Sequence, residues 1–182
     1  DEIDRCLVVA RDVAPELQDR YLLSVLKRPL HRRDRPTATH FTLEVAAYWA
    51  DDFIDAVRSG LRRKLTVGGL RSAGKANLAV ELAPPLRPYT IARIRGHEAV
   101  IAFPAAAALA VRREDGRLDP RPVVEPEGRA PFAARAYRLR FHESFAFRVG
   151  ALTFLCRFVH RDGRRRHPLD WLPAAVFPGY MG

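Results

Sequence analysis

Short segments in which apolar residues alternate with polar ones constrain the fold of this chain more than any other feature. Residues 40–45 read HFTLEV and residues 77–82 read NLAVEL. This alternation is typical of strands that are buried on one face. Four further segments have a strand-like pattern: 89–96, 98–105, 136–149 and 151–166. A tight turn at Gly96–His97 is expected between the first two. We therefore expect the second half of the chain to be rich in strands.

Two segments have the spacing of a helix with one apolar face. In residues 15–27, Pro15 suits the first turn, apolar residues recur at helical intervals, and Pro29 ends the pattern. Residues 52–64 place Phe53, Val57 and Leu61 on one face after Asp51 and Asp52, which favour a helix start. Between and after these patterns, prolines and glycines predict loops over 28–39 and 112–131.

The charge of the chain suggests a polyanionic partner. Lys and Arg number 31 against 21 acidic residues, for a net charge of +10, and almost all the basic residues are arginines. Arginine binds phosphate with two parallel hydrogen bonds. A GC-rich genome, which enriches arginine, would explain part of the excess without any ligand. The basic residues gather in 27–35, 62–64, 138–140 and 160–167. This clustering favours nucleic acid as the partner.

Other classes of protein fit less well. No apolar run approaches the roughly 20 residues that span a bilayer, so we expect a soluble, cytoplasmic chain without a membrane partner. Cys6 and Cys156 are far apart, lie in apolar runs and form no metal-binding motif, so we expect both to be buried and unpaired. We expect no metal and no cofactor.

A glycine-rich segment stands between the second helical pattern and the strand pattern after it. Gly69–Lys75 reads GLRSAGK, which has the spacing of a nucleotide-binding P-loop, but Ala76 occupies the position of the Mg²⁺-binding Ser or Thr. A P-loop also leads from a strand into a helix, which is the reverse of the order expected here. A P-loop phosphotransferase is therefore disfavoured. The glycines still allow a phosphate backbone to approach closely, and an unliganded turn after a helix is the simpler alternative.

The residues from Val67 to Gly74, VGGLRSAG, resemble the G-G-x-[RK]-S-x-G loop of the RAMP superfamily of CRISPR-associated RNA-binding proteins. The resemblance implies an α+β fold with a ferredoxin-like (RRM-like) core over residues 1–88. Residues 89–182 would then add antiparallel strands packed on the same domain. It also implies a non-catalytic subunit that holds guide RNA through phosphate contacts, beside other protein subunits of an effector complex.

These expectations define a set of candidate residues. Two alternatives remain open. One is a metal-independent endoribonuclease that processes guide RNA precursor, for which His31 is the catalytic candidate. The other is a structural basic protein with no specific nucleic-acid role. The residues expected to contact RNA are Gly68, Gly69, Arg71, Ser72, Gly74, Lys75, Arg62, Arg63, Lys64, Arg32, Arg33, Arg164, Arg165 and Arg166.

Overall fold

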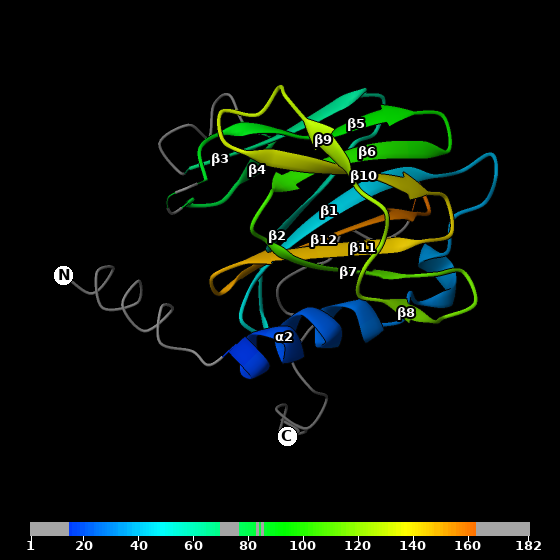
Figure 1. The fold of residues 1–182 in the computed structure, drawn as a ribbon. Coiled ribbons are helices and arrows are strands. Elements are labelled where there is room, and N and C mark those ends of the chain that lie inside the picture. Colours follow the sequence, from blue (N-terminus) through cyan, green and yellow to red (C-terminus); the bar gives the residue numbers. More distant parts are fainter. Residues whose placement is uncertain (1–14, 70–76, 83, 85, 163–182) are drawn as a thin grey trace, which may run out of the picture.

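Two six-stranded sheets pack face to face in the computed structural model, which describes residues 15–69, 77–82, 84 and 86–162 (Figure 1). Sheet A contains β1 (Thr42–Trp49), β2 (Asp52–Arg58), β7 (Ala108–Arg112), β8 (Leu118–Asp119), β11 (Ser144–Val149) and β12 (Leu152–Val159). Sheet B contains β3 (Lys64–Gly68), β4 (Leu78–Ala79), β5 (Tyr89–Arg95), β6 (Glu98–Pro104), β9 (Glu125–Glu127) and β10 (Ala134–Arg140). The strand orders are β2-β1-β12-β11-β7-β8 and β4-β3-β5-β6-β10-β9.

The main core lies between the two sheets. Along β12, Phe154, Cys156 and Phe158 face this core, and along β11 it receives Phe145 and Phe147. Since successive side chains of a strand point to opposite faces, the residues between them face outward. Cys156 is free and buried, as expected, and burial raises the pKa of its thiol well above the ordinary value. Cys6 lies outside the described residues.

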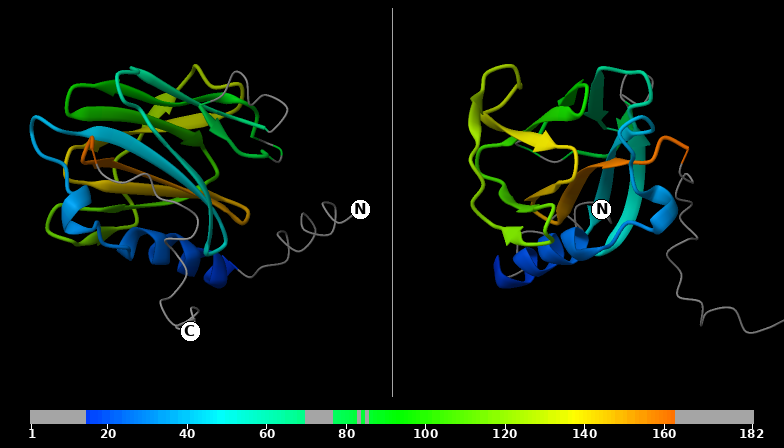
Figure 2. Two further views of the ribbon diagram at one scale, coloured as in Figure 1. Left: turned by 180° about the vertical axis from the view of Figure 1, so that it is seen from behind. Right: turned by 90° about the vertical axis from the view of Figure 1, so that its right-hand side faces the viewer.

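One helix covers part of the outer face of sheet A. Helix α2 (Pro15–Lys27) buries Leu22, Val25 and Leu26 against that face (Figures 1 and 2). The strands beneath it contribute small residues at paired positions, among them Ala46 and Ala146, which let the helix approach closely. The predicted helix over 15–27 is therefore confirmed, and so is its end before Pro29.

The helix predicted over 52–64 is wrong. Residues 52–58 form β2, which pairs with β1 as an antiparallel hairpin through a turn at Ala50, where φ is 51°. Apolar residues at 53, 54, 56 and 57 fit either period, and pairing with the long strand β1 decides in favour of a strand. The chain combines a helix with mostly antiparallel sheets, as expected for an α+β fold. The ferredoxin-like core is not confirmed.

Several strand predictions are confirmed. β5 and β6 form a hairpin whose turn contains Gly96 at a φ of 58°, a conformation that glycine adopts readily. β10, β11 and β12 follow the alternation of the second half, while the predicted 112–131 loop contains the short strands β8 and β9. Each sheet combines strands from both sides of residue 88. Among the described residues, no helix is long and apolar enough to cross a membrane.

Candidate functional site

A row of polar residues crosses the outer face of sheet A, next to the row on which α2 packs. Strand register places one residue from each of five neighbouring strands in this row: Arg58, Glu44, Arg157, Ser144 and Arg112. The helix ends at Lys27 and therefore leaves this polar row to the segment that follows it, residues 28–36. Neighbouring strands are about 4.8 Å apart, so Arg157 and Arg112, which flank Ser144, start roughly 10 Å apart.

Arg157 connects the polar row to the end of the helix. Its side chain is only 3% exposed, and its Nη1 donates a hydrogen bond to the Arg28 carbonyl at 3.2 Å. That carbonyl follows the last turn of α2, where carbonyls lack helical partners, so the bond fixes the path of the chain as it leaves the helix. Glu44 lies 3.9 Å from Arg157 and 3.1 Å from Arg58, so one carboxylate faces two guanidinium groups.

The 28–40 segment is held in place by hydrogen bonds to several parts of the sandwich. Arg28 donates to the Asp51 carbonyl at 3.2 Å, and its guanidinium lies 5.0 Å from the centre of the Tyr48 ring. The Asp34 carbonyl accepts from the His160 N–H at 2.8 Å, and the Ala38 carbonyl lies 2.9 Å from His97 Nε2. These bonds fix the path of the backbone beside the polar row.

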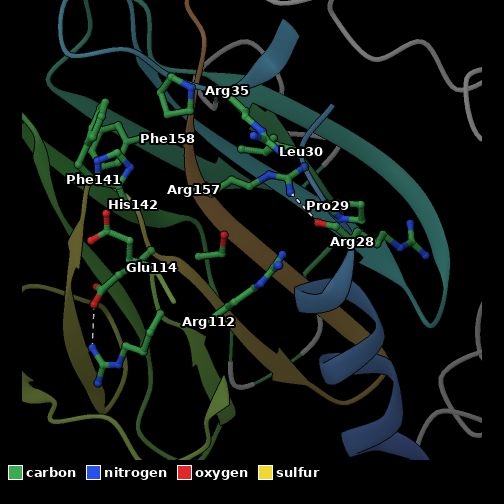
Figure 3. Close-up of a pocket in the computed structure, with 14 residues that line it drawn as sticks. Arg28, Pro29, Leu30, Arg35, Arg112, Glu114, Phe141, His142, Arg157 and Phe158 are labelled. Atoms are coloured by element: carbon green, nitrogen blue, oxygen red, sulfur yellow. Dashed lines mark hydrogen bonds and ion pairs between the residues drawn. The ribbon is translucent and has the colours of Figure 1, made fainter. Parts of the chain in front are cut away.

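A cavity of about 390 Å³ lies between this segment and the polar row (Figure 3). We call it the arginine pocket. Arg112 and Arg157 extend along one side of it, and Phe141 and His142 stand across from them (Figure 3). Its lining consists of Arg28, Pro29, Leu30, Arg35, Pro36, Arg112, Arg113, Glu114, Phe141, His142, Glu143, Ser144, Arg157 and Phe158.

Positive charge exceeds negative charge in the arginine pocket. Of its two acidic residues, Glu143 is already engaged, because Arg113 Nη1 donates to it at 2.8 Å and the Tyr137 hydroxyl at 2.7 Å. Among the described residues, Arg112 and Arg35 form no ion pair and their guanidinium groups make no hydrogen bond. Such an arrangement suits an anion, which would accept hydrogen bonds from the guanidinium groups that line the cavity.

An aromatic cluster adjoins the pocket at the same end of the sandwich. Phe41 stacks on His97 with ring centres 4.4 Å apart, and it meets Phe141 edge to face at 5.3 Å. Phe141 in turn contacts His142 at 4.7 Å and Phe158 at 5.6 Å. Phe145 and Phe147, the next aromatic residues along the chain, are fully buried in the core between the sheets. Of the aromatic side chains from 141 to 147, Phe141 and His142 line the arginine pocket.

The structure separates the residues that the sequence grouped around the glycine-rich loop. Lys64 begins β3 and Gly68 ends it, so the exposed residues Arg62, Arg63 and Lys64 lie roughly 13 Å or more from Gly68. The chain returns after the loop as β4, parallel to β3, with Asn77 hydrogen-bonded to Thr66 at the base. The strand after the loop agrees with the argument against a P-loop, but the helix expected before the loop is wrong, because the loop follows strand β3.

The remaining predicted residues lie outside the arginine pocket or outside the described part of the chain. Gly69 has no positive φ and space for a Cβ, so its backbone does not require glycine. His31 accepts a hydrogen bond from the Arg33 N–H at 3.4 Å and caps the short 3-10 helix η1 (Arg32–Asp34), in which Arg32 and Arg33 are exposed. Neither arginine lines the arginine pocket. The predicted residues outside the described part of the chain are Arg71, Ser72, Gly74, Lys75, Arg164, Arg165 and Arg166.

Sequence reasoning missed Arg112 and Arg157 as members of one site. The two arginines lie far apart in the sequence, and only strand register brings them to either side of Ser144. The available signal was a charged residue inside an apolar strand, as at Arg157 within TFLCRFV and Glu44 within TLEVAA. Among the described residues, no cluster of side chains suits a metal ion. No protein-family model, curated protein or solved structure matches the chain.

Proposed function

We propose that the chain binds single-stranded RNA without cleaving it and holds phosphate groups in the arginine pocket. The observation that carries the proposal is the surplus of guanidinium groups around one cavity, where Arg112 and Arg35 make no ion pair with a described residue. Arginine matches the geometry of phosphate oxygens, and neutralised phosphates release counterions on binding. The pocket therefore supplies affinity that does not depend on base sequence.

Exposed basic residues at the same end of the sandwich extend the surface available to a strand. β5 and β10 end there, beside the β10–β11 turn that carries Phe141 and His142. Arg95 and Arg140 are exposed near these strand ends, and Arg62 and Arg63 precede β3. Phosphate contacts from such residues position a nucleic acid without reading its bases.

A more specific form of the proposal is a subunit that holds guide RNA within a CRISPR effector complex, beside other protein subunits. It rests on the resemblance of residues 67–74 to the RAMP loop. RNA binding through the arginine pocket requires neither that resemblance nor a ferredoxin-like core. The general form places the main phosphate contacts in the arginine pocket, and the specific form places them on the glycine-rich loop. Substitutions in the two places can therefore distinguish them.

The test is the binding of a fluorescent single-stranded RNA across a salt series. We expect Arg112→Ala to weaken binding by about tenfold or more and to make the salt dependence shallower by about one charge. Arg138→Ala is the matched control, because it removes the same charge from an exposed site on sheet B. We expect it to weaken binding much less.

Two results would change the proposal. If the wild-type chain shows no RNA affinity at low salt, RNA binding is wrong. If Arg71→Ala/Lys75→Ala abolishes binding while Arg112→Ala does not, the phosphate site belongs to the glycine-rich loop.

A further inference from the structure

The depth of the arginine pocket limits what can enter it. Arg157 is 3% exposed and lies on the floor, while Arg35 at the rim is exposed. A strand that runs across the surface presents its internal phosphates to exposed side chains, whereas the end of a strand can place its last phosphate beside a buried side chain as well. A cavity of about 390 Å³ lies at the lower end of the range of small-molecule sites, about 300–1,000 Å³. Its size suits one nucleotide.

The two sides of the pocket suit the two parts of a nucleotide. Arg112, Ser144 and Arg157 form a cationic side with a hydroxyl between the two guanidinium groups. Phe141 and His142 stand on the facing side (Figure 3), where a base can stack on an aromatic ring. Of the two acidic residues that line the pocket, Glu143 is bound by Arg113 and Tyr137, and Glu114 is exposed. Glu44 faces Arg157 from the neighbouring strand β1, on the side away from Ser144.

We infer that the arginine pocket receives the phosphorylated end of an RNA strand, as a terminal nucleotide that carries a phosphomonoester. This inference rests on the proposed function and specifies which part of the RNA is bound. A phosphomonoester has three terminal oxygens and carries a charge of roughly −1.5 to −2 at pH 7, whereas an internal phosphodiester has two such oxygens and one charge. The end group can therefore accept hydrogen bonds from more than one guanidinium in the recess.

The experiment compares one RNA sequence in four forms: with a 5′-phosphate, with a 3′-phosphate, with hydroxyls at both ends, and as a closed circle. We expect one phosphorylated form to bind at least tenfold more tightly than the hydroxyl form and the circle. A nucleoside monophosphate with the same phosphate position should compete with that form. Equal binding of all four forms would overturn the inference and leave RNA binding intact, whereas no binding of any form at low salt would overturn both.

Substitution of Ser144 locates the effect in the pocket. Ser144→Asp places a carboxylate between Arg112 and Arg157, where it takes the position of the phosphate, and Ser144→Asn adds a side chain of similar size without charge. We expect the Asp variant to lose the preference for the phosphorylated end and to unfold at the same or a higher temperature than the Asn variant. Arg138→Ala should retain the preference. A preference that survives in a folded Ser144→Asp variant would place end recognition elsewhere and overturn the assignment.

Discussion

Arg112 and Arg113 are neighbours in the sequence but have opposite electrostatic surroundings. Arg113 donates to Glu143 at 2.8 Å and to the Tyr137 hydroxyl at 3.1 Å, and it forms an ion pair with Asp119. These four residues form the Arg113 cluster. Arg112 ends β7 on the outer face of sheet A and forms no ion pair with a described residue. One arginine is balanced by acidic side chains, and the other has no acidic partner among the described residues.

The pKa shifts follow this difference. Hydrogen bonds to Glu143 and Asp119 raise the pKa of the Arg113 guanidinium and hold it as a cation. Burial raises the pKa of the Glu143 carboxyl, but hydrogen bonds from Tyr137, Arg113 and the Arg140 N–H outweigh it, so the pKa lies below its ordinary value of 4.5. The comparison teaches that adjacent arginines can have very different partners: Arg112 is the last residue of β7, and Arg113 follows the strand and is held by Glu143 and Asp119.

Loss of Arg113 should have the largest effect on stability. Arg113→Ala leaves Glu143, which is 7% exposed, without its cationic partner, and Asp119 loses its ion pair. Because the Arg113 side chain is itself 30% exposed, we expect a loss of about 1–3 kcal/mol in the free energy of unfolding, below the range for fully buried pairs. Urea unfolding measures it. A loss no greater than that of Arg112→Ala would remove the distinction between the two arginines.

Removal of the Glu143 charge should give a smaller loss that depends on pH. A carboxyl with a lowered folded pKa stabilises the fold above its unfolded pKa, and this contribution disappears as the pH falls through the folded pKa. We therefore expect Glu143→Gln to be less stable than the wild type at pH 7, by about 1 kcal/mol, and the difference to shrink below about pH 4.5. Thermal unfolding from pH 3 to pH 7 tests this, and a constant difference would contradict it.

Arg112→Ala should have the smallest effect on stability. Its side chain makes no ion pair with a described residue, so we expect the free energy of unfolding to change by no more than about 0.5 kcal/mol. The same variant is expected to lose RNA affinity, which separates binding from folding. A large loss of stability would show that Arg112 has a structural role like that of Arg113, and would weaken the case for a ligand in the pocket.

The parts of the fold that sequence predicts are those with local signals. Residues 15–27 carry a helical apolar stripe between two prolines, and Gly96 marks a hairpin between two alternating segments. Residues 52–58 lack such a signal, because their apolar residues fit both a helix and a strand, and only pairing with β1 selects between them. The basic segment 27–35 was predicted as a cluster of charge. Its position beside the polar row could not be, because that row is formed by strand register, which the sequence does not reveal.

The hydrogen bond between Arg157 and the Arg28 carbonyl joins positions 129 residues apart. Contacts over such long separations form late, because the intervening chain must first be ordered. During synthesis, the end of α2 emerges long before β12, so the floor of the arginine pocket does not exist until nearly all of the described chain has been made. A nascent chain therefore has its exposed arginines early but acquires the recess between them only when its last described strand has joined sheet A.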